Sequence, residues 1–176
     1  MYKNNLIVLI LLALIFTAGI SCTEVQNNDT SDTSDTSAET RPIHYGSDIC
    51  AFTNKTIDVV RYGGQIIMQD GTEYKFMSVE CVAGFYLSLE DKSLIASMRI
   101  VDFAEGYQLL PVDELVFLHS TLRPSPNGMF ITAVDASNQK MKNYIYDAYP
   151  GPYLDWDEVL ELVRNEWDLT EPTAQK

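Results

Sequence analysis

The sequence is poor in basic residues: 12 lysines and arginines stand against 25 aspartates and glutamates, and the formal net charge is −13. Binding a nucleic-acid backbone requires a basic surface, and so does electrostatic attachment to anionic lipids. The charge balance therefore argues against both functions. Any attachment to a membrane must be hydrophobic or covalent.

Histidine is also scarce, with two residues in a chain of 176. The sequence lacks a glycine-rich phosphate loop, a Gly-x-Ser-x-Gly motif and a His-Glu-x-x-His motif. Acid–base catalysis would have to use carboxylates, and no obvious pair of them is present. We therefore expect that the protein is not an enzyme. Its length allows one compact domain or two small ones packed together.

An apolar run opens the sequence and ends shortly before a cysteine. Lys3 precedes the run, which extends over residues 6–16. It is shorter than the roughly 20 apolar residues of a membrane-spanning helix and is typical of a signal-peptide core. Gly19 and Ser21 then lead to Cys22, in a pattern that resembles the lipobox of bacterial lipoproteins, although leucine is commonest at the Gly19 position.

The lipobox resemblance implies that residues 1–21 are removed and that Cys22 is acylated. We therefore expect a lipid-anchored protein of the cell envelope, either periplasmic or at the outer membrane. An ordinary secretory signal with a chance cysteine, or an uncleaved anchor, are the alternatives. Residues 22–41 contain three successive Asp-Thr-Ser repeats and almost no apolar side chain, which predicts a disordered tether.

Two small α+β units are predicted after the tether, at residues 42–108 and 109–169, followed by a tail at 170–176. In the first unit, Asp70-Gly71 separates two short runs and predicts a β-hairpin over residues 65–76. Ser78 is a typical N-cap for an amphipathic helix that extends to about Leu89. A further strand is expected over residues 93–103.

The second unit follows a similar order. Strands are predicted at 115–118 and 129–134, on either side of a proline-containing loop. A polar stretch then connects to a helix that begins at Asp155, and Glu158 lies three residues further on, as in a capping box.

The segment Ile43-His-Tyr-Gly-Ser-Asp-Ile-Cys50 resembles the opening of the NosL family, the copper-binding accessory lipoproteins of nitrous oxide reductase. Residues 70–81 resemble the hairpin and helix start of that family. Residues 118–120 and 125–128 resemble its later strand and Ser-Pro-Met-Gly loop. The resemblance extends from residue 42 to residue 167 in one order. It implies a fold of two strand-and-helix units, related to that of organomercurial lyases.

The metal motif of the family is degenerate in this chain. The family has an aspartate before Cys-x-x-Cys-x-Met, whereas here Thr53 replaces the second cysteine and Lys55 replaces the methionine. In the later loop Asn127 stands where the family has methionine. Cu(I) prefers thiolate and thioether ligands, so three such replacements are expected to weaken copper binding. Of the four soft side chains, Cys50 alone remains.

The candidate Cu(I) ligands are Cys50, His119 and Met129, with Met68 as a further soft group. If the second unit packs against the first, His119 and Met129 could approach Cys50 from two sides of one cleft. The alternative is that Cys50 is a small buried residue that binds no metal.

Cys81 has two interpretations: a buried structural cysteine, or the partner of Cys50 in a disulfide formed in an oxidising compartment. The charge of Asp48, two residues before Cys50, is expected to raise the pKa of the Cys50 thiol and make it less reactive.

The resemblance implies a membrane-anchored lipoprotein that binds Cu(I) or delivers it to a copper enzyme or copper transporter. The alternative is a relative that binds no metal and acts as a membrane-tethered interaction or assembly factor. An enzyme of the organomercurial-lyase type has only fold analogy in its favour.

Overall fold

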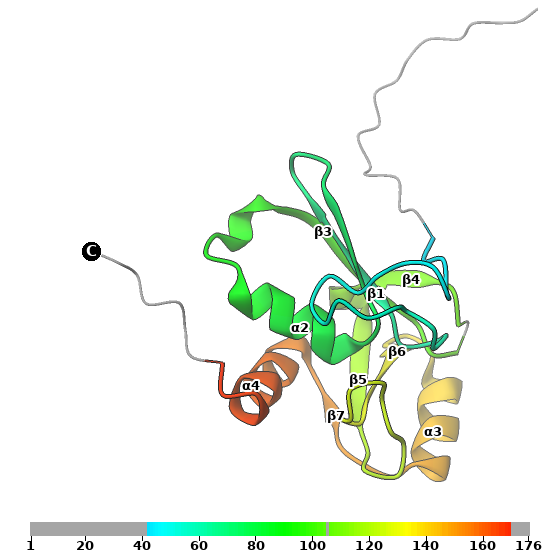
Figure 1. The fold of residues 1–176 in the computed structure, drawn as a ribbon. Coiled ribbons are helices and arrows are strands. Elements are labelled where there is room, and N and C mark those ends of the chain that lie inside the picture. Colours follow the sequence, from blue (N-terminus) through cyan, green and yellow to red (C-terminus); the bar gives the residue numbers. More distant parts are fainter. Residues whose placement is uncertain (1–41, 105, 170–176) are drawn as a thin grey trace, which may run out of the picture. The chain divides into compact units, whose positions relative to one another are not determined.

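The computed structural model describes residues 42–104 and 106–169 (Figure 1). The predicted signal peptide (1–21), the lipidation site Cys22 with its tether (22–41) and the tail (170–176) lie outside the described residues. In the described ranges, no helix is long and apolar enough to cross a membrane.

The first sheet has four antiparallel strands in the order β2-β1-β3-β4. They are β1 (Gly64–Met68), β2 (Glu73–Phe76), β3 (Ile95–Val101) and β4 (Leu109–Pro111). The turn between β1 and β2 is closed by the N–H of Gly71, which donates to the Met68 carbonyl (2.9 Å), and Gly71 has a positive φ of 83°. This conformation favours glycine, and the predicted Asp70-Gly71 hairpin is confirmed.

Helix α2 (Val79–Ser88) follows this hairpin. The Ser78 side chain accepts from the backbone N–H of Cys81 and caps the helix, and Leu89 is its C-cap. The start and end predicted from the sequence are therefore confirmed. The helix packs against both sheets, so almost its whole first two turns are buried.

The second sheet has the order β6-β5-β7 and is also antiparallel. Its strands are β5 (Leu115–His119), β6 (Ile131–Asp135) and β7 (Tyr153–Leu154). Helix α4 (Trp156–Glu166) begins directly after β7, and Asp155 and Glu158 form the predicted capping box through reciprocal backbone contacts.

Helix α3 (Gln139–Ala148) occupies the stretch that the sequence analysis treats as a polar connection. Asn138 caps it by accepting from the backbone N–H of Met141 (3.0 Å). Ile145 is its one buried residue, and its apolar stripe is short: Met141, four positions earlier, and Tyr149, four positions later, pack with Ile145 in a mostly polar segment. This weak signal explains the missed helix.

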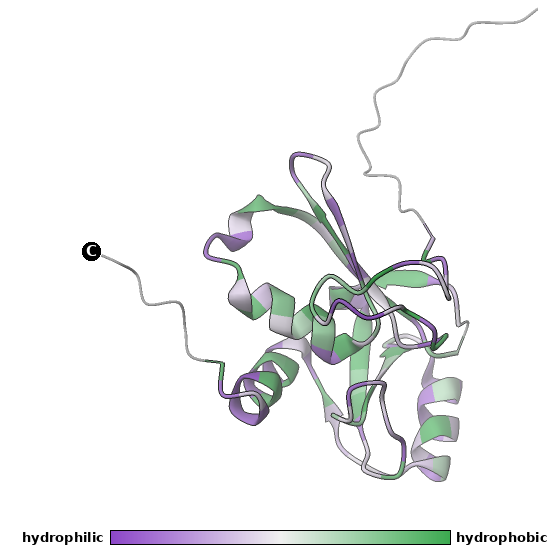
Figure 2. Ribbon diagram, viewed as in Figure 1, coloured by the Kyte–Doolittle hydropathy of each residue, from purple (hydrophilic) through white to green (hydrophobic). Residues whose placement is uncertain are grey.

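The main hydrophobic core is shared by the two sheets, α2 and α4, and includes Phe76, Val82, Ile100, Phe117 and Val159. Side chains of β5 alternate between two faces, because successive residues of a strand point in opposite directions. Phe117 enters the main core, and Leu118 enters a smaller core with Val134 and Ile145 under α3. Figure 2 shows hydrophobic colouring along β5 and mixed colouring on α3 and α4.

These elements confirm the predicted α+β class. Strand β4 lies just beyond the expected boundary at residue 108, yet it pairs with β3 in the first sheet, from Arg99↔Pro111 to Val101↔Leu109. The division into units at 108/109 stays a prediction.

Candidate metal centre

A tight turn over residues 50–55 presents Cys50. The N–H of Cys50 donates to the Lys55 carbonyl (2.8 Å), and the N–H of Asn54 donates to the Cys50 carbonyl (2.8 Å). Asn54 has a φ of 56°, in the left-handed region that asparagine tolerates better than most residues. The turn is attached to β2 because the N–H of Ala51 donates to the Lys75 carbonyl (2.8 Å).

An aromatic stack fixes the same turn to the helices. The Phe52 ring lies parallel to that of Trp167, with centroids 5.2 Å apart and an interplanar angle of 8°. Both rings pack over Gly84 of α2, where a Cβ atom would lie 2.7 Å from Phe52 Cζ. The close approach of the stack to α2 therefore depends on glycine at this position.

The start of α2 brings a second thiol to Cys50. Cys81 lies in the first turn of the helix, and both cysteines are fully buried and free. Their side chains are hydrogen-bonded to each other. The disulfide considered from the sequence is therefore not formed in this structure, although its two members are neighbours.

The environment of Cys50 stabilises a thiolate. Hydrogen bonding from Cys81 lowers the pKa of Cys50 to about 5, against the opposing effect of burial. The hydroxyl and N–H of Thr53 and the N–H of Met77 add to the lowering. The pKa of Cys81 is raised by the same bond to Cys50 and by burial. These opposite shifts favour a pair that shares one proton at neutral pH.

A thioether completes this group of sulfur atoms. Met77 is buried, and its Sδ accepts a hydrogen bond from Thr53 Oγ1 (3.4 Å). The Thr53 hydroxyl also lies within hydrogen-bonding reach of the Cys50 sulfur. One hydroxyl therefore contacts both sulfur atoms, and the Met77 N–H bonds to Cys50 as well.

Asn127, from the loop between β5 and β6, covers the other side of the cysteine pair. Its Nδ2 donates to Cys81 Sγ (2.9 Å) and to Ser78 Oγ (2.9 Å). The loop is held by Glu80, whose Oε1 accepts from Ser125 Oγ (2.6 Å) and from the N–H of Asn127 (3.2 Å). Burial raises the pKa of Glu80, with the Ser125 bond opposing it, because the charged form is disfavoured away from water.

The structure overturns the expectation for Asp48. Its carboxylate contacts Lys75 Nζ at 2.7 Å and accepts from the N–H of His44 at 2.7 Å. Burial opposes the effect of these partners, yet they lower the pKa of Asp48. Lys75 pairs with this charge, and the pKa of Cys50 is lowered by hydrogen bonding from Cys81 and not raised as expected. Lys55 is exposed on the turn.

His119 and Met129 lie together in a different place. They line a cavity of about 260 Å³ whose other lining residues are Thr121, Gly128, Phe130, Leu162 and Glu166. Cys50 is not among the lining residues. The sequence analysis places His119 and Met129 on two sides of one cleft at Cys50, and their role as Cu(I) ligands with Cys50 stays a prediction without a contact to support it. Met68 lines a third cavity, beside Leu94 and Tyr74.

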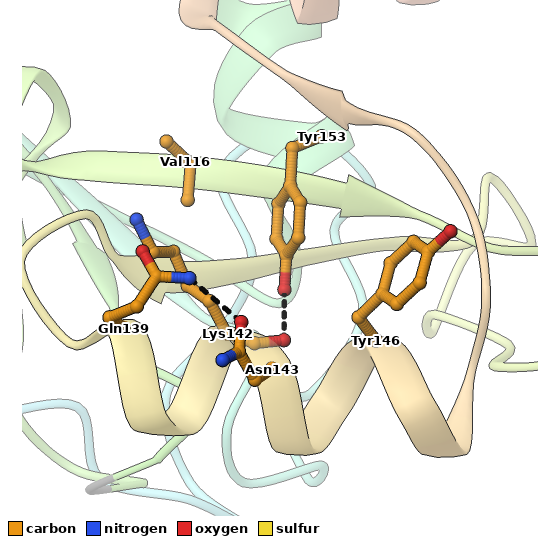
Figure 3. A pocket seen from close by; sticks show the side chains of 6 residues that line it. All are labelled: Val116, Gln139, Lys142, Asn143, Tyr146 and Tyr153. Carbon is orange, nitrogen blue, oxygen red and sulfur yellow. Dashed lines mark hydrogen bonds between the residues drawn. The ribbon is translucent and has the colours of Figure 1, made fainter.

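A separate pocket lies between α3 and the second sheet (Figure 3). Tyr153 donates from its hydroxyl to the Lys142 carbonyl (2.7 Å), and Gln139 Nε2 donates to Asn143 Oδ1 (2.7 Å). The lining residues include no soft metal ligand. The pocket adds nothing to the centre at Cys50.

In the described part of the chain, no group of three or more His, Cys, Asp or Glu side chains is placed to hold a metal. The group at Cys50 has two thiols, and its third sulfur is the thioether of Met77. The sequence analysis named neither as a ligand, because it interpreted Cys81 as a buried structural cysteine or the disulfide partner of Cys50 and assigned Met77 to core packing. One feature of the sequence could have indicated that these two sulfur atoms lie close together. Met77 and Cys81 are four residues apart on either side of the Ser78 cap, at the start of a helix.

Comparison with solved structures identifies the fold. No protein-family model matches the sequence, and a search of curated proteins finds no match. The arrangement of sheets and helices is a NosL-like α+β fold. It is similar to the crystal structure of the copper chaperone NosL from Shewanella denitrificans, with a TM-score of 0.59 and 15% sequence identity over 69% of this chain and 95% of that one.

Proposed function

We propose that this protein is a membrane-anchored lipoprotein of NosL type that binds Cu(I) through Cys50 and delivers it to a copper enzyme or copper transporter. The observation that carries the proposal is a buried, free cysteine beside a second thiol in a NosL-like fold, and hydrogen bonding lowers the pKa of this cysteine. A thiolate is the form of cysteine that binds metals, and soft Cu(I) prefers it to oxygen ligands. A carrier of this kind needs no catalytic residues, in keeping with the expectation of a non-enzyme.

The proposed location rests on the start of the sequence. An apolar run followed by Gly19, Ser21 and Cys22 supports acylation of Cys22 and attachment to a membrane of the cell envelope. The acidic, polar residues 23–41 would then separate the lipid from the folded part. The strongly negative charge disfavours nucleic acid as a partner.

A second candidate function is that of a tethered interaction or assembly factor that binds no metal. It is favoured by the hydrogen bonds of Thr53 and Asn127, which occupy two positions where the family has soft ligands. Their side chains donate to Met77 Sδ and Cys81 Sγ, so the sulfur atoms have polar partners without a metal.

Competition with a coloured Cu(I) chelator tests the first function on the full chain in detergent. The native protein should remove Cu(I) from the chelator, and Cys50→Ala should not. Met98→Leu is the matched control, because Met98 belongs to β3 and packs against the main core. Native binding no stronger than that of Cys50→Ala would exclude the copper function.

The triple change Thr53→Cys, Lys55→Met and Asn127→Met tests the second function, because it restores the motif of the family. If the native chain is a non-binding relative, the restored chain should acquire Cu(I) affinity that the native chain lacks. Equal affinity in both chains would contradict this second candidate.

A further inference from the structure

We infer that Cys81 and Met77 are the partners of Cys50 in a Cu(I) site of three sulfur atoms, which replaces the ligands lost at Thr53, Lys55 and Asn127. The inference rests on the proposed copper function and names the atoms that carry it out. Cys50 is far along the chain from Met77 and Cys81. These three buried residues converge where the turn over residues 50–55 meets the start of α2.

The contacts fix this convergence from several directions. Cys50 and Cys81 are hydrogen-bonded to each other, and the Met77 N–H bonds to Cys50. The Thr53 hydroxyl contacts the sulfur atoms of Met77 and Cys50 together. Two of the three sulfur atoms thus share the Thr53 hydroxyl, and the third, that of Cys81, is bonded to Cys50. We expect a copper ion to displace the hydroxyl.

The charges at this position suit a monovalent cation. Two thiolates and one Cu(I) give a single net negative charge, which lies at the N-terminus of α2, where the helix dipole stabilises anions. Lys75 neutralises Asp48, so this nearby carboxylate adds little further charge. Structural zinc sites usually have four ligands, whereas two thiolates and a thioether suit softer Cu(I).

Loading exchanges protons for the metal. Binding Cu(I) forms two copper–thiolate bonds, breaks each S–H bond that the two cysteines still hold, and releases those protons to solvent. No change of oxidation state is involved. Asn127 and Thr53 are the half-buried side chains over the sulfur atoms, and their donor groups must shift to admit the ion.

Two substitutions test the assignment on the full chain. Cys81→Ser keeps the size of the side chain, and Met77→Leu conserves volume and is expected to cost less than about 1.5 kcal/mol of stability. Loss of a residue that supports a metal ligand typically weakens metal binding by roughly 10–100-fold. Cys81 is itself a proposed ligand, so its loss should weaken Cu(I) binding by more than about 100-fold. Met77→Leu should weaken it by about tenfold or more, and Met98→Leu should leave it unchanged.

X-ray absorption at the copper edge counts the sulfur neighbours directly, and its reading of the native chain does not depend on how well the variants fold. The native chain should show three sulfur neighbours, and Met77→Leu should show two. Native binding no stronger than that of Cys50→Ala removes the proposed function and this inference together. If the native chain binds Cu(I) and folded Cys81→Ser and Met77→Leu bind it with the same affinity, this inference alone is overturned. The same holds if an imidazole nitrogen is among the neighbours of the copper.

Discussion

Acidification of the metal-free protein tests whether Cys50 and Cys81 share one proton. The hydrogen bond from Cys81 lowers the pKa of Cys50 to about 5, and the same bond raises the pKa of Cys81. In the unfolded chain both thiols titrate near pH 8.5. Between about pH 5 and 8.5 the unfolded pair therefore holds two protons and the native pair holds one.

This difference sets the sign and size of the effect. The stabilisation from Cys50 is fully present above its unfolded pKa and is lost as the pH falls through its native value near 5. A difference of one proton gives a slope of up to about 1.4 kcal/mol per pH unit, with stability rising toward higher pH. Above about pH 8.5 the unfolded pair holds no proton while Cys81 keeps one, so the slope reverses.

Urea unfolding measures this slope. The native chain, Cys50→Ala and Cys81→Ala are compared under reducing conditions between about pH 6 and pH 8. Other groups, including Glu80 with its raised pKa, titrate in all three chains and cancel in the comparison. The native chain should gain roughly 1 kcal/mol per pH unit more than either variant. Parallel curves for the three chains would refute the shared proton.

Three further changes probe other parts of the molecule. Gly84→Ala gains roughly 1 kcal/mol of helix propensity but places a Cβ 2.7 Å from Phe52 Cζ and 2.8 Å from Trp167 Cζ3. Because overpacking costs about 1–3 kcal/mol, the free energy of unfolding should fall, and tryptophan fluorescence should change. A gain in stability with unchanged fluorescence would contradict the stacking. Glu80→Gln keeps an oxygen acceptor for the loop and should be nearly neutral, whereas Glu80→Leu leaves buried donors without a partner and should cost about 1–3 kcal/mol in urea unfolding. Equal stability of these two variants would exclude a role for Glu80 in holding the loop. Cys22→Ser should abolish incorporation of a labelled fatty acid and move the protein from the membrane fraction to the soluble fraction, and retention in the membrane fraction would count against lipid anchoring.

The sequence by itself determines the local elements of this fold. The Asp70-Gly71 turn, the Ser78 cap and the Asp155–Glu158 capping box are all confirmed, because each depends on contacts within four residues of the chain. Helix α3 escapes prediction because it buries a single residue, and its apolar stripe of Met141, Ile145 and Tyr149 is short and lies in a mostly polar segment. The overall α+β class follows from the order of the elements that can be predicted.

The tertiary structure alone decides which side chains form the centre. Cys50 and Cys81 meet because the turn binds to β2 through Ala51 and Lys75, and no local pattern encodes that docking. The register of β5 with β6 places His119 opposite Ile131, close to Met129 and in a separate cavity. Residue types can be read along the chain, but distances between remote segments depend on how the sheets and helices pack. That packing makes Cys81, a buried cysteine of α2, the neighbour of Cys50.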